Sequence, residues 1–422
     1  MHSVTNAIPT GTIASIPAKA HAHRALICAA LANSPSTILL SRTSKDIDAT
    51  MDSLRGLGAH VVYENKIVTV TPGPAPVKGN VVPHESGTTL RLLLPVAASI
   101  CNDVDVDAKG RLPDRPLEPM LGEMKAHGVT FSQDKPPFTM TGLLQGGNFS
   151  MVGDVSSQFF SGLLLAAPQI GLSTITSTTP LQSSDYVTLT TETMRDFGVE
   201  VEHTLPDTNI NEAFTVPFGA SFIGRDNYQI EGDWSNAAIW MVAAGMTGKP
   251  ITITGMNKNS VQADRRIMQV MIDAGCDVVW DGMNVTVTGR ASKPIHADLE
   301  QMPDMLPVMA ALACSISGES SFVKGARLRL KESDRLIAVA NLVKDLGGTV
   351  REEGDDLYII GSGILKGGHG DCVNDHRLVM AGTLMALISE NPVTLKDSEA
   401  ITKSYPHFFD DWNFLGGNAQ PL

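Results

Sequence analysis

The chain has 422 residues, long enough for two or three domains at roughly 150 residues each. Hydrophobic residues make up 43% of it and charged residues 18%, a composition that excludes a disordered chain and is typical of a globular protein. The formal net charge of −13 disfavours nucleic-acid binding, because proteins that bind nucleic acid usually carry a basic surface. Any anionic ligand must therefore be bound by local basic groups.

The cysteines and the N-terminal sequence favour a cytoplasmic protein. The five cysteines are scattered and form no CxxC pair, which disfavours a disulfide framework and a zinc ribbon. Residues 1–20 contain no apolar core of the signal-peptide type. No apolar run reaches the length of about 18 residues that a membrane span needs. We therefore expect a cytoplasmic protein with no membrane segment.

One pattern recurs along the chain: an amphipathic stretch, a glycine, and two strand-like segments separated by a polar turn. The glycines are 69 to 77 residues apart and lie at Gly58, Gly128, Gly198, Gly275, Gly347 and Gly416. The stretch before each one has helical periodicity, as at Leu336, Val339, Val343 and Leu346. Glycine is the expected residue after such a helix, because it adopts a positive φ at little cost.

A second recurring element, about half a repeat away, is an Ala- and Leu-rich helix that opens with polar or charged residues. These openings are marked by Lys19, Glu85, Ser156, Ser235, Asp304 and Asp375. A short strand follows each helix. Together the two patterns predict six units of roughly 70 residues. The sixth unit ends without its two strands, and we expect the N-terminal segment to complete it.

The six units predict two lobes. Three units, residues 18–229, form one lobe, and the other three, residues 230–422, form the second together with residues 1–17. The apolar helices can be buried only at the centre of each lobe. If they are roughly parallel, their N-termini emerge on one face, where free N–H groups and about half a positive charge per helix attract anions.

Basic residues are concentrated at the openings of the apolar helices and in nearby turns. They are Lys19, Arg24, Arg91, Arg115, Lys331, Arg335, Arg377 and Lys403. Arginine suits bidentate binding of carboxylate or phosphate, and lysine is a compact charge that can exchange a proton. Ser156, Ser157 and Gln158 add neutral donors. This set predicts a small substrate, or a pair of substrates, with several negative charges.

Two acidic residues, Asp304 and Glu332, are candidates for general acid–base chemistry in this cationic setting. Taken alone, Asp304 is equally well explained as a helix cap, and residues 331–335 as an ion-paired helix start. The recurrence of charge at equivalent points of the repeat favours the functional interpretation. His21-x-His23 resembles the opening of some metallohydrolases, but no matching His or Asp constellation follows it. No glycine-rich phosphate loop is present in the sequence, which disfavours nucleotide-dependent chemistry.

At these openings the sequence resembles the 5-enolpyruvylshikimate-3-phosphate synthase family. The matching stretches span essentially the whole chain and are IPAKAHAHRALICAALA, SGTTLRLLLPVAA, GRLPDRPLEPM, GDVSSQFFSGLLLAAP, QMPDMLPVMAALA, RLRLKESDRL, VNDHRLVM and ITKSYPHFF. The sibling family that transfers enolpyruvyl to a UDP-sugar is less similar, and the sequence has no equivalent of its cysteine-bearing loop. The resemblance implies an α/β (α+β) fold of two lobes, each with three βαβαββ repeats around buried parallel helices (an inside-out α/β barrel), and an active site in the cleft between them.

The resemblance also implies a reaction: transfer of the enolpyruvyl (1-carboxyvinyl) group of phosphoenolpyruvate to the 5-hydroxyl of shikimate 3-phosphate, releasing phosphate, in aromatic amino-acid (chorismate) biosynthesis. The positions implied to bind phosphoenolpyruvate are Lys19, the backbone at Gly87, Arg115, Arg335, Arg377 and Lys403. Those implied to bind shikimate 3-phosphate are Arg24, Ser156, Ser157, Gln158, Ser183, Tyr186, Asp304 and Lys331. Asp304 is implied to accept the hydroxyl proton, and Glu332, with Lys19 nearby, to protonate the enol carbon C3. We expect no metal, no organic cofactor, no nucleic-acid or membrane partner, and a monomer.

Three residues depart from the family pattern. Ala20 stands where Ser usually follows the first Lys, which removes a hydroxyl near the shikimate carboxylate, and losing such a hydrogen bond costs about 1.5–3 kcal/mol. Glu85 and Arg327 stand where Asn is common. These departures leave open a weakened homologue that binds anions for regulation. The UDP-sugar transferase is a further alternative, and a metallohydrolase built on His21 and His23 is the least favoured.

Overall fold

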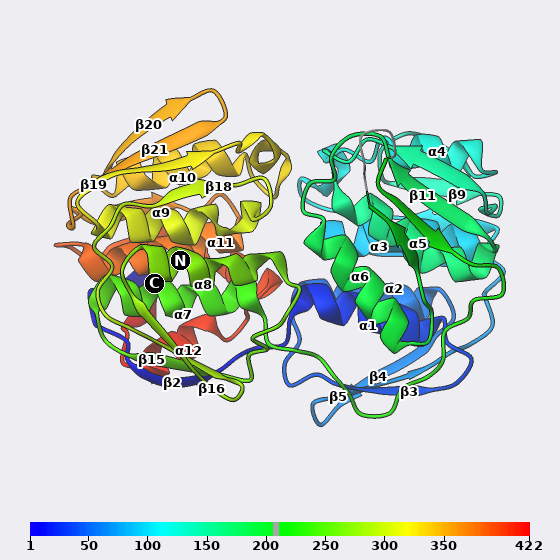
Figure 1. The fold of residues 1–422 in the computed structure, drawn as a ribbon, viewed down its shortest axis with the longest axis horizontal. Helices are drawn as coiled ribbons and strands as arrows, with labels where there is room; N and C mark the ends of the chain where they lie inside the picture. The colour runs from blue at the N-terminus through cyan, green and yellow to red at the C-terminus, as the bar shows by residue number, and fades with distance from the viewer. Residues whose placement is uncertain (206–210) are drawn as a thin grey trace. The chain divides into compact units, whose positions relative to one another are not determined.

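The computed structural model describes residues 1–205 and 211–422. The chain forms two compact units: unit 1 comprises Met1–Ile16 and Glu231–Leu422, and unit 2 comprises Pro17–Ile230. Both units combine helices with four-stranded sheets, so the mixed α/β fold expected from the sequence is confirmed (Figure 1). Among the described residues there are six such sheets, and each is open rather than closed into a barrel.

In no described part of the chain is a helix both long enough and apolar enough to span a membrane.

Each sheet joins a parallel pair of strands to an antiparallel pair. In unit 2 the first sheet has the order β14 (Tyr228–Gln229), β3 (Ser36–Leu39), β5 (Ile67–Thr71), β4 (His60–Glu64). The second is β6 (Gly79–Val81), β7 (Asp103–Val106), β9 (Phe138–Thr141), β8 (Thr130–Phe131). The third is β10 (Asn148–Met151), β11 (Ser173–Ser177), β13 (Ala213–Val216), β12 (Glu202–Thr204). An apolar helix connects the parallel strands β6 and β7, and another connects β10 and β11.

Unit 1 repeats this arrangement. Its first sheet has the order β16 (Asp277–Asp281), β17 (Asn284–Thr288), β15 (Ile251–Thr254), β2 (Gly11–Ala14). The second is β18 (His296–Asp298), β19 (Gly318–Val323), β21 (Asp356–Gly361), β20 (Thr349–Glu353). The third is β22 (Gly368–Asp371), β23 (Val393–Lys396), β1 (His2–Val4), β24 (Ala419–Pro421). The recurrence of one strand order explains the 70-residue repeat of the sequence.

The N-terminal segment completes the sixth sheet as predicted, but two details of that prediction are wrong. Strand β1 pairs antiparallel with both β23 and β24, so the two chain ends lie side by side (Figure 1). The C-terminal residues are not without a strand, because they form β24 itself. The second N-terminal strand, β2, belongs to a different sheet, where it pairs in parallel with β15. Only one strand of the sixth sheet therefore comes from the N-terminus.

The helices fall into two sets, as the sequence predicts. The buried apolar set is α1 (Lys19–Ala30), α3 (Gly87–Ile100), α5 (Ser157–Ile170), α7 (Trp234–Thr247), α9 (Leu306–Ser315) and α11 (His376–Met385). The amphipathic set is α2 (Lys45–Gly56), α4 (Met120–Ala126), α6 (Asp185–Asp196), α8 (Ile267–Asp273), α10 (Arg335–Asp345) and α12 (Phe408–Phe414). The glycine that follows each amphipathic helix has a φ between 86° and 103°, so its predicted role as a helix stop is confirmed.

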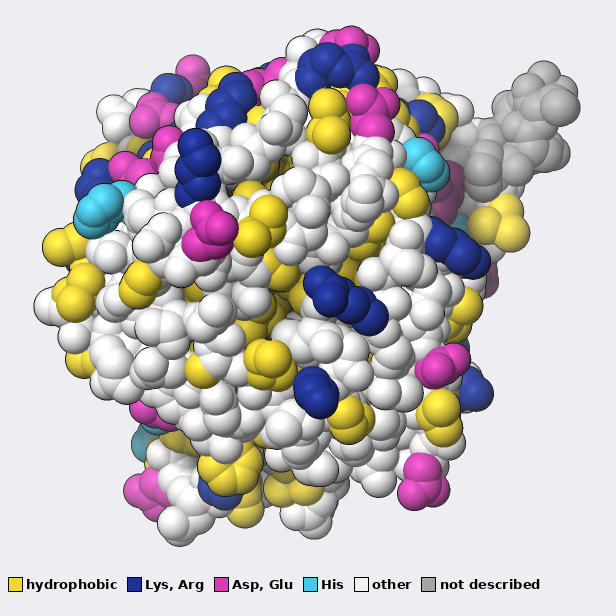
Figure 2. All heavy atoms as spheres, turned by 90° about the vertical axis from the view of Figure 1, so that its left-hand side faces the viewer, with side chains coloured by type: hydrophobic (Ala, Val, Ile, Leu, Met, Phe, Trp, Pro, Cys, Tyr) yellow, Lys and Arg dark blue, Asp and Glu magenta, His cyan; other side chains and the backbone are white. Residues whose placement is uncertain are grey.

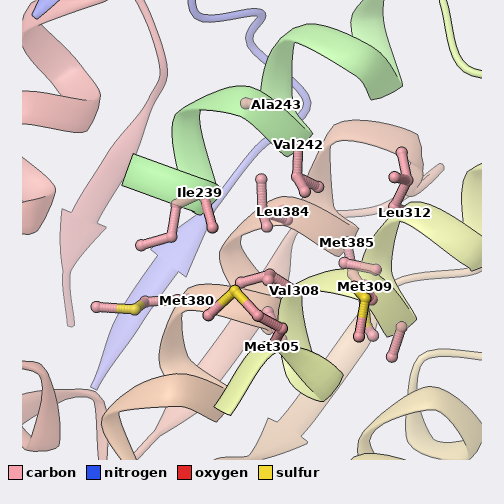
Figure 3. Packing of buried hydrophobic residues seen from close by; sticks show 14 of the residues in the cluster. Ile239, Val242, Ala243, Met305, Val308, Met309, Leu312, Met380, Leu384 and Met385 are labelled. Atoms are coloured by element: carbon pink, nitrogen blue, oxygen red, sulfur yellow. The ribbon is translucent and has the colours of Figure 1, made fainter. Parts of the chain in front are cut away.

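The core of unit 1 forms where its three apolar helices meet. Figure 3 shows side chains from α7, α9 and α11 pointing toward one another, among them Val242, Val308 and Leu384. These helices are apolar around most of their circumference, which is the pattern of a helix buried on all sides. The first turns of α7 and α11 nevertheless carry polar residues, which are Ser235 and Asn236 in α7 and His376 and Arg377 in α11.

A close approach of two apolar helices in unit 2 gives a first prediction. A Cβ at Gly162 of α5 would lie 2.5 Å from the carbonyl oxygen of Arg91 on α3. Because backbone cannot move aside cheaply, we expect Gly162→Ala to lower the free energy of unfolding by about 1–3 kcal/mol in urea denaturation.

Gly122→Ala is the matched control, because this exposed glycine in α4 meets only the flexible Glu118 carboxylate, 3.1 Å from the added carbon. It should be neutral or stabilise by up to about 1 kcal/mol. Equal unfolding midpoints for the two variants would contradict the close packing of α3 and α5.

Candidate active site

In unit 2 the beginnings of α3 and α5 lie against each other. The Gln158 amide, in the first turn of α5, donates through Nε2 to Thr88 Oγ1 of α3 at 2.9 Å. Its Oε1 accepts a hydrogen bond from Arg91 Nη1 at 3.2 Å. Both helices carry serine N-caps: Ser86 accepts from the Thr89 N–H, and Ser156 accepts from the Gln158 N–H. Ser157 follows Ser156 and is buried beside it.

The beginning of α1 is linked to the same place through Asp46 of α2. Lys19 Nζ lies 2.8 Å from Asp46 Oδ2, and the Asp46 carbonyl accepts a hydrogen bond from Thr89 Oγ1 at 3.3 Å. The N-cap residue of α1 is Ala18, which provides no side-chain acceptor. The N-cap side chain of α1 therefore does not compete with a ligand for the first N–H groups of the helix. Nothing local in the sequence marks Asp46 as the partner of Lys19.

Arg115 packs directly on Gly87 at the start of α3. A Cβ at Gly87 would lie 2.6 Å from Arg115 Nη1 and 3.0 Å from its Cζ. Only glycine leaves room for the guanidinium over the helix N-terminus. The fold thus brings together two residues that the sequence placed in one set, although 28 positions separate them.

Arg24 is held inside unit 2 by neutral acceptors. Its guanidinium donates to Thr190 Oγ1 at 2.7 Å, to the Ala20 carbonyl at 2.7 Å, to Ser161 Oγ at 3.3 Å and to the Tyr186 carbonyl at 2.9 Å. Burial lowers the pKa of Arg24 to about 10, so the group stays charged at neutral pH. These contacts fix Arg24 as a link between α1, α5 and α6, close to Tyr186.

Ser183 lies beside Tyr186 in unit 2. Its carbonyl accepts a hydrogen bond from the Tyr186 N–H at 3.1 Å, and its backbone is in the left-handed region with a φ of 54°. The hydrogen bond makes Ser183 part of the turn that precedes α6. The nine predicted site residues of unit 2 are Lys19, Arg24, Gly87, Arg115, Ser156, Ser157, Gln158, Ser183 and Tyr186.

In unit 1 the beginnings of α7, α9 and α11 also meet. Arg377 of α11 donates through Nη1 to the Ser235 carbonyl of α7 at 3.0 Å. Arg335 donates through Nη1 to Asp304 Oδ1 at 2.7 Å, in the 3₁₀ helix η3 (Pro303–Met305) that leads into α9. The same guanidinium contacts Asp375, the N-cap of α11, through Nε at 2.9 Å and Nη2 at 3.2 Å. Arg335 therefore connects α9 to α11.

Asp375 is the most deeply buried carboxylate of this group, with no exposed surface. Besides Arg335 it accepts hydrogen bonds from Ser333 Oγ at 3.0 Å and from the Arg377 N–H at 2.9 Å. It caps α11 and fixes Arg335 at the same time. In the sequence Asp375 stands out only as a repeat marker, although its position directly before an apolar helix and two residues from Arg377 is a signal of this role.

The carboxylates of unit 1 are balanced by several cations. Asp304 Oδ1 lies 3.1 Å from Lys331 Nζ as well as 2.7 Å from Arg335. Burial alone would raise the pKa of Asp304, but Lys331, Arg335 and Arg377 together lower it well below its usual range, so Asp304 is ionised. Burial lowers the pKa of Lys331 although Asp304 opposes this shift. Glu332 Oε2 accepts from Arg335 Nη2 at 2.7 Å.

Lys403 lies beside the beginning of α11. It ends the 3₁₀ helix η6 (Ser398–Lys403), and its Nζ donates to the Asn374 carbonyl at 2.8 Å. The six predicted site residues of unit 1 are Asp304, Lys331, Glu332, Arg335, Arg377 and Lys403.

The whole sequence from residue 7 to residue 412 matches the family of EPSP synthase (3-phosphoshikimate 1-carboxyvinyltransferase). The chain belongs to the EPSP synthase family. It is similar to curated proteins named 3-phosphoshikimate 1-carboxyvinyltransferase from Clostridium kluyveri (35% identical, covering 96% of this chain and 95% of the relative) and from Methanocorpusculum labreanum (34% identical, covering 97% of each). Its fold is similar to that of EPSP synthase from Acinetobacter baumannii, with a TM-score of 0.81, 23% identity and 99% of each chain covered.

The structure shows the contacts of the three residues that depart from the EPSP synthase pattern. Ala20 offers only its carbonyl, to Arg24. Glu85 packs on Gly110, where a Cβ would lie 2.8 Å from the Glu85 carboxyl carbon. Arg327 lies in the 3₁₀ helix η4 (Ala326–Leu330), and its charge contributes to the lowered pKa of Lys331. The charge of Arg327 is thus close enough to Lys331 to act on it.

The two histidines of the metallohydrolase alternative take part in packing around α1. A ring nitrogen of His21 is 2.8 Å from the Tyr228 hydroxyl, and His23 Nδ1 is 2.6 Å from Thr50 Oγ1. Burial lowers the pKa of His21 to about 4, so the ring is neutral at neutral pH. No group of His, Cys, Asp or Glu side chains with metal-ligating geometry occurs in residues 1–205 and 211–422.

Asp264 is a further buried carboxyl group of unit 1, close to Ser235, Asp304 and Arg377, and nothing local in the sequence marks it. It belongs to the 3₁₀ helix η2 (Ala263–Arg266), is 1% exposed and accepts a hydrogen bond from the Ser235 hydroxyl. Burial and then repulsion from Asp304 raise the pKa of Asp264 to about 6, against the attraction of Arg377. Asp264 and Asp304 thus have pKa values displaced in opposite directions.

This displaced pKa gives a prediction about stability. The folded state binds the Asp264 proton more tightly than the unfolded chain does, so this group's contribution to stability falls as pH rises from about 4 to about 6. Above that range the buried carboxylate destabilises the fold by about 3 kcal/mol. We expect Asp264→Asn to raise the melting temperature at pH 7.5 by several degrees, and by much less at pH 5, in calorimetric scans.

Asp298→Asn serves as the control, because it removes a half-exposed carboxylate of the same unit that pairs with Lys324 at the surface. Surface pairs of this kind contribute about 0–1 kcal/mol, so its melting temperature should change little at either pH. A gain for Asp264→Asn that is the same at both pH values would contradict the assigned titration.

Proposed function

We propose that the protein transfers the enolpyruvyl group of phosphoenolpyruvate to the 5-hydroxyl of shikimate 3-phosphate and releases phosphate, a reaction of chorismate biosynthesis. The observation that carries the proposal is the meeting of three helix beginnings in each unit, with cationic side chains around them. Helix N-termini and arginine forks are the groups that proteins use to bind phosphate and carboxylate. Membership of the EPSP synthase family supports this choice of substrates.

The surface charge supports small anions over nucleic acid. On the face that Figure 2 shows, Lys and Arg side chains are interspersed with Asp and Glu side chains. A nucleic-acid site would need a continuous basic stripe. The cations that bear on function are instead mostly buried, as Arg335 and Arg377 are.

In this proposal the active site is a cleft between the lobe of residues 18–229 and the lobe of residues 230–422 with 1–17. The division of the residues supports it: Ser156, Ser157 and Gln158 belong to unit 2, whereas Asp304 and Glu332 belong to unit 1. Closure of the lobes would exclude water and strengthen the charge contacts. We expect a monomer.

The proposed chemistry needs only proton transfers and two changes of C–O bonding, so no metal or organic cofactor is required. Glu332, with Lys19, protonates C3 of phosphoenolpyruvate, and C2 becomes cation-like. Asp304 removes the proton from the 5-hydroxyl, whose oxygen bonds to C2. In the second step C3 loses a proton, the C2–O bond to phosphate breaks, and phosphate leaves. Lys331, Arg335, Arg377 and Lys403 bind the charged groups that remain anionic throughout.

The direct test is phosphate release from the two substrates. The wild-type protein should release one phosphate per enolpyruvyl group transferred, and no release at high protein concentration would contradict the proposed function. We expect Lys19→Met to lower kcat by at least about a hundredfold, because it removes a positioned proton-transfer group. Its melting temperature should change little, because Lys19 lies in the first turn of α1 and is only half-buried.

Lys45→Met is the matched control for this variant. Lys45 lies next to Asp46 in sequence and is exposed, so the same change removes a charge of the same type outside the beginnings of the buried apolar helices. It should retain wild-type turnover. Unfolding of Lys19→Met, or equal losses in both variants, would show that Lys19 has a structural role instead.

The departure at Ala20 gives a separate prediction. Ala20→Ser restores the hydroxyl at the half-buried start of α1. One hydrogen bond to a charged group is worth about 1.5–3 kcal/mol, so we expect the KM for shikimate 3-phosphate to fall roughly ten- to a hundredfold. Ala30→Ser, the same change at the other end of α1, should leave that KM unchanged. An unchanged KM in both variants would mean that the wild-type protein already fills this contact with another group.

A further inference from the structure

One buried carboxyl group has no role in the proposed reaction and yet is connected to a residue that does. The Ser235 hydroxyl donates to Asp264, and the Ser235 carbonyl accepts from Arg377 Nη1 at 3.0 Å. Ser235 therefore links the carboxyl of η2 to the guanidinium of α11. Asp264 is 1% exposed, Ser235 9% and Arg377 5%. Solvent therefore does little to screen the charges of Asp264 and Arg377 from each other.

The groups that face Asp264 come from three other elements. They are Ser235 and the N-cap Asp233 of α7, Asp304 of η3 and Arg377 of α11. On its own element, Arg265 Nη1 donates to the Lys258 carbonyl and Arg266 Nη1 to the Ala263 carbonyl. Arg377 is thus the cation whose charge acts most on Asp264. Ionised Asp264 attracts Arg377 and is repelled by Asp304.

We propose that Asp264 is a proton-dependent positioning residue, which holds Arg377 through Ser235 when it is ionised and loosens it on gaining a proton. The inference rests on the proposed function, because Arg377 is the group there that binds phosphoenolpyruvate. Asp264 itself touches no substrate. Its effect is to restrict the Arg377 side chain to one orientation, which saves the entropy of ordering it when the ligand binds.

The charges around Asp264 explain why this carboxyl takes the proton first. Asp304 is held ionised by Lys331, Arg335 and Arg377, whereas burial and the charge of Asp304 outweigh the attraction of Arg377 at Asp264. Because two nearby carboxylates repel each other, the less compensated one is protonated at higher pH. The pKa of Asp264, raised to about 6 by burial and by Asp304, places the change between pH 5 and pH 7.

A spectroscopic experiment tests the link without relying on turnover. The full chain is labelled with ¹⁵N-arginine, and the Arg377 side-chain signal is assigned by its loss in Arg377→Lys. In the wild-type protein this signal should shift with a midpoint near pH 6, and in Asp264→Asn the shift should be absent. A signal that does not move with pH, or that moves equally in both proteins, overturns the proposal.

A kinetic experiment tests the consequence for catalysis. The kcat/KM for phosphoenolpyruvate is measured for the wild type and for Asp264→Asn from pH 5 to pH 8. The value for the wild type, divided by the value for Asp264→Asn, is plotted against pH. Substrate ionisation cancels in this ratio because both proteins meet the same substrates. The ratio should be near one at pH 5 and rise at least about tenfold by pH 7.5, since an interaction with a charged group is worth about 1.5–3 kcal/mol. A flat or falling ratio overturns the proposal.

Two further variants separate this effect from a general loss of structure. Asp411→Asn removes another buried carboxylate of unit 1, one that binds the Tyr405 hydroxyl at 2.8 Å, and its ratio to wild type should be flat. If Asp264→Asn does not fold, Ser235→Ala is used instead. It removes the hydroxyl that donates to Asp264, and it should abolish the shift of the Arg377 signal. Absence of phosphate release by the wild type would overturn the proposed function alone, because the Arg377 signal still reports on the link.

Discussion

The beginnings of six buried helices are the constraint on which the described structure depends. Each beginning carries free N–H groups and a partial positive charge that must be satisfied away from water. Four of them carry polar N-caps, which are Ser86, Ser156, Asp233 and Asp375. Polar side chains are therefore favoured at these points of otherwise apolar helices. The same requirement produces a place where anions can bind, so the binding chemistry follows from how the helices are buried.

The protein buries its two deepest arginines in opposite ways. Arg24 is surrounded by neutral acceptors, and burial lowers its pKa. Arg335 contacts three carboxylates; burial works against its charge, yet Asp375, Glu332 and Asp304 raise its pKa above the usual range. An incoming anion can compete with Asp304 and Glu332, which are each 23% exposed, for the charge of Arg335. It cannot displace Asp375, which has no exposed surface and binds the Nε and Nη2 groups along one edge of the guanidinium. Arg335 is thus fixed on one side and available on the other.

Local patterns made most of the fold predictable, whereas the site depended on distant partners. The glycine after each amphipathic helix and the apolar helices are readable because helix periodicity and positive φ are properties of a few neighbouring residues. Strand β24 was missed because its three residues follow two glycines and pair only with the other end of the chain. The roles of Asp46, Asp264 and Asp375 were missed for the same reason. Arg335 and Asp375 are 40 positions apart, and only the packing of α10 against α11 reveals that they are partners.

The contrast between Asp304 and Asp264 bears on how a base with a low pKa can act in the proposed reaction. Asp304 is ionised because Lys331, Arg335 and Arg377 compensate its charge, and a carboxylate so stabilised is a weak base. Anionic substrates that bind to these cations would take over part of that compensation. The proton affinity of Asp304 would then rise in the complex, where a base is needed, and stay low in the free protein. Asp264, whose pKa burial and Asp304 raise to about 6, holds its proton only below about that pH, and there it adds no second charge against Asp304. Two carboxyl groups near the same three helix beginnings are in this way set to different tasks by the charges that each one faces.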